Sequence, residues 1–312
     1  MNDWESFDVV VPGSTANLGA GFDSIGMAVN RFLRMTLSPA QDLKIDIQGK
    51  ELESLKDNSD NLVVQVIQDA FQEMGRKMPG FRLEMKSDIP LMGGLGSSAA
   101  AIVAGLAAAN HLLGKPWSQE ELLQKATRIE GHSDNVGASL FGGVVVTSWD
   151  GTKVDAITSS PPPLCLVAAI PRFPLATSKS REVLPEVLSY KEAILGSSRA
   201  NLLTAALLTG NWEQLRVGMN DRFHQPYRLS LVPGLEQILE EAYEYGALGV
   251  ALSGAGPTVV AFTLNPEPLS AYLKGVFTEL KLPADILLLE PCTKGLHVDL
   301  TKVKDRSTLL RN

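Results

Sequence analysis

The chain has 312 residues, of which 45% are hydrophobic and 20% are charged. This balance excludes global disorder and predicts a globular protein of about two domains. Lys and Arg total 28 against 35 for Asp and Glu, which gives a net charge of −7 at pH 7. We therefore expect no nucleic-acid partner, because such binding relies on a basic surface.

The two cysteines, Cys165 and Cys292, stand alone rather than in Cys-x-x-Cys motifs. Neither a structural zinc site nor a disulfide framework is predicted from them. The longest apolar run, residues 99–109, is far shorter than the ~20 residues that cross a bilayer. Residues 1–5 include two acids and lack the basic and apolar regions of a signal peptide. We therefore expect a cytoplasmic protein with no membrane association.

The first half of the chain is predicted to mix strands and helices. A first strand at 7–11 runs into glycine-bearing turns that extend to Gly26. Ser118 is a credible N-cap, since Glu120 and Glu121 follow it in the first turn of a helix. Further strands are expected at 44–48, 81–85 and 141–147, and helices at 61–74, 99–113 and 118–130.

The second half begins after a proline run at 161–163, which indicates a linker. We place the domain boundary between residues 150 and 163, so the expected domains are 1–155 and 156–312. The hydrophobic patterns there predict strands at 164–170, 249–252, 259–264 and 285–289, and helices at 190–208 and 235–245. The fold class expected from these elements is α+β.

A glycine-rich segment, residues 93–98, opens directly onto the alanine-rich helix at 99–113. Its glycines allow close backbone approach, and the helix N-terminus offers free N–H groups, so the segment is suited to holding phosphate. It is not a Walker loop, because Ser97 stands where that motif has lysine. The alternative is a flexible turn that is capped by serine.

Two more glycine clusters could contribute to a site. Residues 253–258 lie between two predicted strands, where an ordinary hairpin is the alternative. Residues 12–23 follow the first strand and offer Asn17 and Asp23. These two side chains could instead satisfy backbone N–H groups within the turn.

Together, and in this order, the three segments resemble the signature of the GHMP kinase family: a proline-glycine start, a Pro-x-x-x-Gly-Leu-Gly-Ser-Ser-Ala loop and a late glycine motif. The resemblance implies ATP-dependent phosphoryl transfer by a two-domain α+β enzyme. Its N-terminal domain would be of the ribosomal-protein-S5-like type and its C-terminal domain a ferredoxin-like α/β plait, with the active site between them. Such enzymes are often homodimers.

Residues 13–23, 130–136 and 225–228 are most similar to family members that act on L-homoserine. This resemblance implies transfer of a phosphoryl group from ATP to the side-chain hydroxyl, which yields O-phospho-L-homoserine on the route to threonine. It also implies Mg²⁺. The residues expected to bind ATP are Pro90, Leu91, Met92, Gly93, Gly94, Leu95, Gly96, Ser97, Ser98, Ala99, Ala100, Gly254 and Gly256.

For the metal, the resemblance points to Ser98 and an acid near the end of the helix at 118–130. Glu130 is our choice, because a carboxylate and a hydroxyl meet the hard-oxygen preference of Mg²⁺. Two alternatives stay open. At the longer family spacing the position is Gln124, which is neutral, and Glu130 could be a solvated acid at a helix end.

A zwitterionic substrate needs cations for its carboxylate and an acidic or carbonyl partner for its ammonium. By resemblance, Arg181 and Arg228 bind the carboxylate and Asp23 meets the ammonium, whereas each arginine alone would be read as a surface ion pair. Polar groups expected around the substrate side chain are Asn17, His132 and Asn135.

The catalytic group is expected among Asn135, Asp134 and His132. Asp134 matches the base of related kinases, but it could also be the N-cap of a short helix beginning near Val136. Asn135 could orient the hydroxyl without a base, because phosphoryl transfer depends chiefly on positioning. His132 could be a base or a hydrogen-bonding group, and the other histidines, His111, His224 and His297, are expected to be structural.

Two other functions compete with this interpretation. One is a kinase of the same family that acts on a mevalonate-like or sugar alcohol, and the other is a catalytically silent nucleotide-binding regulator. The combination of Asp23 with the two arginines favours an amino-acid substrate, since a sugar needs neither charge.

Overall fold

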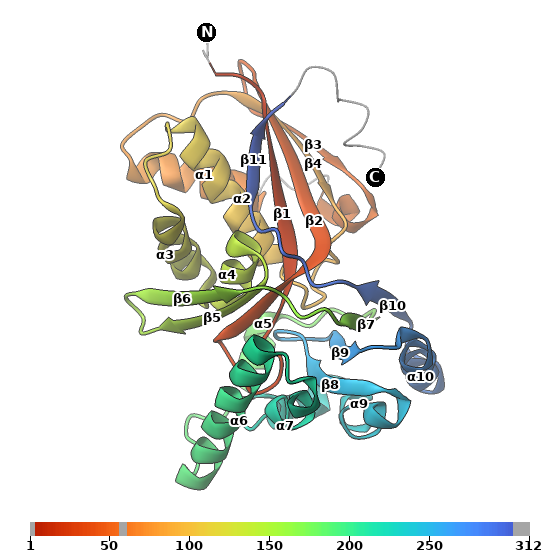
Figure 1. Ribbon diagram of the computed structural model, residues 1–312. Helices are drawn as coiled ribbons and strands as arrows, with labels where there is room; N and C mark the ends of the chain where they lie inside the picture. Colours follow the sequence, from red (N-terminus) through yellow and green to blue (C-terminus); the bar gives the residue numbers. More distant parts are fainter. Residues whose placement is uncertain (1–3, 56–60, 302–312) are drawn as a thin grey trace.

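The computed structural model describes residues 4–55 and 61–301. Within this part of the chain the strands form two sheets, each covered by helices (Figure 1). This arrangement confirms the α+β class. The prediction that residues 1–5 do not resemble a signal peptide rests partly on residues 1–3, and these three lie outside the described residues.

The first sheet has the order β11-β1-β2-β4-β3, and β5 pairs with β2 and carries β6. In the second part of the long strand β2 the buried residues alternate, at Leu33, Met35 and Leu37, as expected where a sheet has one covered face. Only β3 with β4 is a parallel pair among the described strands. The strands are β1 (Phe7–Ala16), β2 (Ile25–Pro39), β3 (Lys44–Gln48), β4 (Phe81–Ser87), β5 (Val144–Trp149), β6 (Val154–Ser159) and β11 (His297–Leu300).

Helices pack against one face of this sheet, with α2 at their centre (Figure 1). Nearly every residue of α2 between Ala99 and Ala109 is buried, because α1, α3, α4, β1 and β2 surround it. Its small side chains permit this close packing on all sides. The elements are η1 (Lys50–Leu55), α1 (Leu62–Glu73), α2 (Ser97–Leu112), α3 (Gln119–Glu130) and α4 (Asp134–Phe141).

The second sheet has the order β10-β7-β9-β8 and its own hydrophobic core with α9 and α10. Helix α6 projects from the opposite side (Figure 1). The strands are β7 (Cys165–Pro171), β8 (Ala247–Leu252), β9 (Val259–Thr263) and β10 (Ala284–Leu289). The helices are α5 (Thr177–Glu182), α6 (Tyr190–Thr209), η2 (Trp212–Gln214), α7 (Leu215–Gly218), α8 (Gln225–Arg228), η3 (Leu229–Leu231), α9 (Leu235–Glu241), η4 (Ala242–Tyr245) and α10 (Pro266–Glu279).

Most predicted elements are present with shifted ends, and Ser118 caps α3 through a capping box with Glu121. The elements missed from the sequence include the strands β2, β6 and β11 and the helices α5, α7, α8 and α10. The glycine-bearing turns predicted up to Gly26 are present only over residues 17–24, because β1 continues to Ala16 and β2 already begins at Ile25. Helix α10 escaped prediction since it starts at Pro266, although proline fits a first turn.

The expected domain division at residue 155 stays a prediction. The chain passes from the first sheet to the second between β6 and β7, and β11 returns to pair with β1. No described helix combines the length and apolar character that a bilayer-spanning segment requires.

Candidate active site

A cavity of about 390 Å³ lies where the three glycine-rich segments meet. Asn17 and Asp23 line it from the turn after β1, and Gly254 and Gly256 from the loop between β8 and β9. The segment that leads into α2 contributes Gly93, Gly94, Gly96, Ser97 and Ser98. The structure therefore brings together groups that are more than 200 residues apart (237 between Asn17 and Gly254). Residues 253–258 form the hairpin loop between β8 and β9, and the same loop also forms a wall of the cavity.

The segment before α2 is held in a left-handed backbone conformation that favours glycine. Gly94 has φ +74°, and a Cβ atom there would lie 2.5 Å from the carbonyl oxygen of Ser253. Ser253 Oγ donates to the Gly94 carbonyl at 2.6 Å and contacts Thr15 Oγ1 at 2.9 Å. These hydrogen bonds join all three glycine-rich segments.

Most residues predicted to bind ATP line the cavity, including Leu91, Met92, Ser97 and Ser98. The other four are not part of the lining: Leu95, Ala99 and Ala100 are fully buried, and Pro90 is half-buried. The first turn of α2 begins at Ser97 and has no side-chain cap, so its N–H groups are available for an anion.

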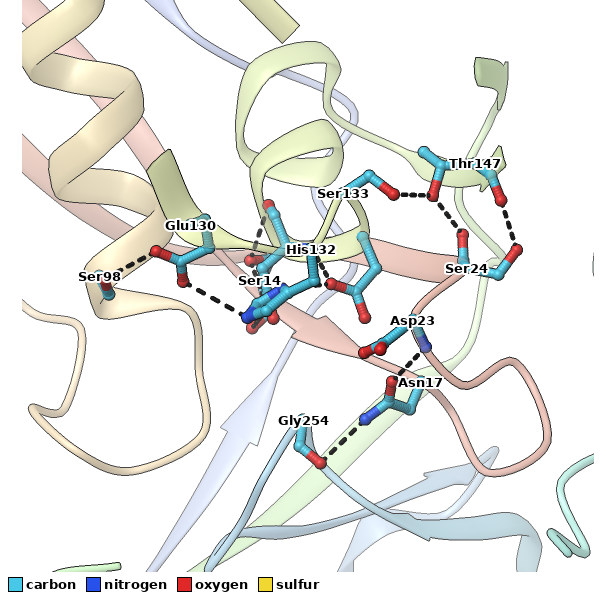
Figure 2. A network of polar contacts seen from close by, with 12 residues as sticks. Ser14, Asn17, Asp23, Ser24, Ser98, Glu130, His132, Ser133, Thr147 and Gly254 are labelled. Atoms are coloured by element: carbon cyan, nitrogen blue, oxygen red, sulfur yellow. Dashed lines mark hydrogen bonds and ion pairs between the residues drawn. The ribbon is translucent and has the colours of Figure 1, made fainter. Parts of the chain in front are cut away.

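Ser98 and Glu130 form a pair of hard oxygen ligands, because Ser98 Oγ donates to Glu130 Oε2 at 2.9 Å (Figure 2). Burial raises the pKa of Glu130, and His132 and the Ser98 hydrogen bond oppose that rise. With a side chain only 12% exposed, Glu130 is not a solvated acid at a helix end. Gln124 instead bonds both the N–H and the C=O of Val154, outside the cavity lining.

His132 lies between two acids, with Nδ1 2.9 Å from Asp134 Oδ1 and Nε2 3.8 Å from Glu130 Oε1 (Figure 2). Burial lowers the pKa of His132, but the Asp134 hydrogen bond and the two carboxylate charges outweigh it, so the pKa is raised. Protonation of His132 would place a positive charge between the two acids at this end of the cavity.

Asp134 is the first residue of α4, so the helix expected near Val136 begins two residues earlier, with Ser133 at its N-cap. Asp134 Oδ1 also accepts the N–H of Asn135 at 2.7 Å. The amide nitrogen of Asn135 donates to Ser14 Oγ at 3.0 Å. Its Oδ1 has no hydrogen-bond partner among residues 4–55 and 61–301, and Asn135 lines the cavity. That oxygen can accept a substrate hydroxyl.

Asp23 and Arg181 form a two-pronged ion pair with N–O distances of 3.0 and 2.8 Å. Burial lowers the pKa of Arg181, but the Asp23 carboxylate outweighs it and raises the pKa. The predicted ammonium-binding and carboxylate-binding groups therefore contact one another. The pair lines the cavity, so it is more than a surface ion pair.

Arg228 is almost fully buried, at 1% exposure, and lines the same cavity. Its Nε donates to the carbonyl of Ser180 at 2.9 Å and its Nη1 to that of Gly254 at 3.1 Å. Burial, together with the nearby charge of Arg181, lowers the pKa of Arg228 to about 10. The guanidinium stays protonated at neutral pH.

Asn17 behaves as the local alternative suggested. Its Nδ2 donates to the carbonyl of Gly254, and its Oδ1 accepts the N–H of Asp23 (Figure 2). Asn17 thus shapes the turn that presents Asp23, while a direct contact with substrate stays a prediction.

Sequence reasoning missed two parts of the cavity. Phe22 lies 5.7 Å and 5.5 Å from the guanidinium carbons of Arg181 and Arg228, and its only sequence signal was its place beside Asp23. The second part is an apolar end formed where η1, α1 and β4 approach one another. It is lined by Leu33, Leu52, Leu62, Val63, Met85 and Ile89, and no motif marked these residues.

Comparisons with known proteins agree over nearly the whole chain. Sequence models described as "GHMP kinases N terminal domain" and "GHMP kinases C terminal" match residues 61–143 and 203–276. A homoserine kinase of Carboxydothermus hydrogenoformans is 41% identical, with coverage of 95% of this chain and 97% of that protein. One of Deinococcus radiodurans is 45% identical, with coverage of 88% and 90%.

Solved structures give the same picture. The crystal structure of homoserine kinase from Cytophaga hutchinsonii has a TM-score of 0.82 at 29% identity and covers 96% of this chain and 99% of that one. A mevalonate kinase of L. major in complex with R-mevalonate has a TM-score of 0.67 at 19% identity, with coverage of 90% and 95%. The second likeness shows the fold alone.

Proposed function

The chain belongs to the GHMP kinase family, and on this premise we propose that it phosphorylates the side-chain hydroxyl of L-homoserine. The two-domain α+β fold of that family is confirmed, and the protein is an ATP-dependent small-molecule kinase. Its products are O-phospho-L-homoserine and ADP, on the route to threonine. The observation that carries the choice of substrate is the presence of Asp23, Arg181 and Arg228 in one cavity with the phosphate loop.

The nucleotide would occupy the cavity from its glycine loop to its apolar end. The phosphates fit at residues 93–98, where glycine backbone and the N-terminus of α2 face the cavity. The adenine ring fits among the aliphatic side chains contributed by η1, α1 and β4, since an aromatic ring gains from leaving water there.

Ser98 and Glu130 would hold Mg²⁺. Two neighbouring ligands of an octahedral Mg²⁺ at 2.0–2.1 Å are about 2.9 Å apart, and the two side-chain oxygens are 2.9 Å apart. The described residues contain no cluster of three or more His, Cys, Asp or Glu side chains around a metal position. Mg²⁺ draws its other ligands from water and nucleotide phosphates, so two protein ligands suffice. The ion would neutralise phosphate charge.

The amino-acid end of homoserine would exchange partners with the Asp23–Arg181 pair. Its ammonium takes Asp23 and its carboxylate takes Arg181 and Arg228, so that each charge in the cavity keeps an opposite charge. A sugar carries neither charge, and mevalonate carries a carboxylate but no ammonium for Asp23. The pairing of Asp23 with two arginines therefore favours an amino-acid substrate over a sugar or mevalonate.

Asn135 would orient the reacting hydroxyl through its Oδ1. Asp134 already accepts hydrogen bonds from His132 and from the Asn135 N–H at one oxygen. Since phosphoryl transfer through a loose transition state depends mainly on positioning, we infer that no dedicated base is required. A role of Asp134 as base is the alternative, and an Asp134→Asn variant with near-normal kcat would exclude it.

The decisive experiment is a coupled ADP-release assay with Mg-ATP and a panel of L-homoserine, L-serine, L-threonine, mevalonate and galactose. Turnover of homoserine far above the others is expected. Turnover of only mevalonate or galactose would contradict the roles of Asp23, Arg181 and Arg228, and ATP binding without any turnover would favour a regulator. The homodimer and the cytoplasmic location stay predictions.

A further inference from the structure

His224 is a fully buried imidazole that no sequence motif marked, and it lies directly behind the substrate-binding groups. We propose that His224 is a positioning residue for the substrate carboxylate, which holds Arg228 and the turn carrying Asp23 in one fixed arrangement through a neutral imidazole protonated on Nε2. This inference rests on the proposed homoserine kinase function. It adds a group that touches neither ATP nor homoserine.

The partners of His224 define its tautomer. Nε2 lies 3.0 Å from the carbonyl oxygen of Gly19, and Nδ1 lies 2.9 Å from Nη1 of Arg228. A carbonyl oxygen can only accept a hydrogen bond and a guanidinium can only donate one. The imidazole must therefore donate from Nε2 and accept at Nδ1, which leaves no place for a second proton.

Burial favours the neutral ring despite the acids nearby. Burial lowers the pKa of His224 and the Arg228 charge adds to this, whereas Asp221, the Gly19 carbonyl and Asp23 oppose it. Asp221 Oδ2 is 3.5 Å from Nε2. Its two oxygens also accept the backbone N–H groups of residues 223–225 at the start of α8. Asp221 thus anchors the helix that carries Arg228.

The result is a guanidinium with one free edge. Nε donates to Ser180, and the two N–H groups of Nη1 reach His224 and Gly254. Nη2 of Arg228 has no hydrogen-bond partner within the described residues, and Arg228 lines the cavity. Without an acceptor at His224 Nδ1, one N–H would lose its partner and the guanidinium could turn away from the substrate carboxylate.

The same imidazole also supports the turn that carries Asp23, the residue proposed to bind the substrate ammonium. The ring of Phe22 stacks on His224, with 4.9 Å between ring centroids. Phe22 precedes Asp23, and Gly19, which accepts from Nε2, belongs to the same turn. His224 therefore links the acid that meets the ammonium to the arginine that meets the carboxylate, across 205 residues of sequence from Gly19.

Two substitutions test the roles of the two imidazole nitrogens of His224 separately. His224→Gln can still donate near Nε2 but offers Arg228 no acceptor near Nδ1, and His224→Asn does the reverse. We expect His224→Gln to raise the KM for homoserine about tenfold or more, since a hydrogen bond to a charged group is lost. KM for ATP should change little, and His224→Asn should recover part of the homoserine binding. His111→Gln, at a histidine outside the cavity lining, is the matched control.

A spectroscopic measurement tests the tautomer without substrate. In long-range ¹H–¹⁵N spectra of the wild-type protein, His224 should show the Nε2–H form and should not titrate between pH 6 and 8. The inference is overturned by an unchanged homoserine KM in His224→Gln, by an equal rise in KM for ATP, or by an Nδ1–H or titrating imidazole. Failure of the wild-type protein to turn over homoserine would instead overturn the proposed function. The spectrum does not depend on that function, so it tests the His224 tautomer separately.

Discussion

Replacing Asp23 with asparagine most directly tests the proposed binding of a zwitterionic substrate by Asp23, Arg181 and Arg228, because it removes one charge and almost no volume. The carboxylate is held by two N–O contacts from Arg181, yet both side chains are more than a third exposed (36% and 38%). A pair exposed to this degree contributes about 0–1 kcal/mol to stability. The fold should therefore tolerate Asp23→Asn, with a change in unfolding free energy below about 1 kcal/mol.

The effect on homoserine should be much larger. In the complex Asp23 meets the substrate ammonium inside the cavity, and a hydrogen bond between charged groups contributes about 1.5–3 kcal/mol. Its loss corresponds to a fall in kcat/KM for homoserine of about 10- to 150-fold, with KM for ATP nearly unchanged. The assay is coupled ADP release at saturating Mg-ATP, with urea unfolding of the same preparation as the measure of stability.

Asp285→Asn is the matched control. Asp285 receives two similar contacts from Arg172, at 2.9 and 2.7 Å, but the pair is exposed and does not line the cavity. This variant should keep wild-type kinetics. The reasoning is refuted if Asp23→Asn retains its KM for homoserine, or if KM for both substrates rises equally in Asp23→Asn.

Three further outcomes are expected. Ser98→Ala should raise the Mg²⁺ concentration for half-maximal activity about tenfold or more, whereas Ser97→Ala should change it less, and equal effects would remove Ser98 from the metal site. Gly94→Ala should lower the unfolding free energy by about 1–3 kcal/mol, because its Cβ would meet the Ser253 carbonyl at 2.5 Å, and an unchanged urea midpoint would contradict this. His132 has a raised pKa, so its stabilising contribution is complete below pH 6.5 and is lost as the pH rises through the folded-state value; His132→Gln should flatten that part of the stability profile.

The helix and strand pattern was predictable where the signal is local. Ser118 with Glu121 defines the start of α3, and the alanine-rich run after Ser98 could only be a buried helix, because its neighbours in sequence decide both features. The glycines of the phosphate loop belong to the same class, since a left-handed backbone favours glycine whatever surrounds it. Helix α10 was missed because it starts at Pro266, and β2 was missed because it begins at Ile25 directly after a glycine-rich turn, and both glycine and proline also mark turns.

By itself the sequence determined the family, the three glycine-rich segments and the candidate residues, since each is a pattern of residue types along the chain. Only the tertiary structure decided their partners. Asp23 meets Arg181 across 158 positions, Glu130 rather than Gln124 faces Ser98, and His224 lies behind Arg228. Such pairings depend on how two sheets and their helices pack together, and hydrophobic packing brings together residues whose spacing in sequence carries no trace of the contact.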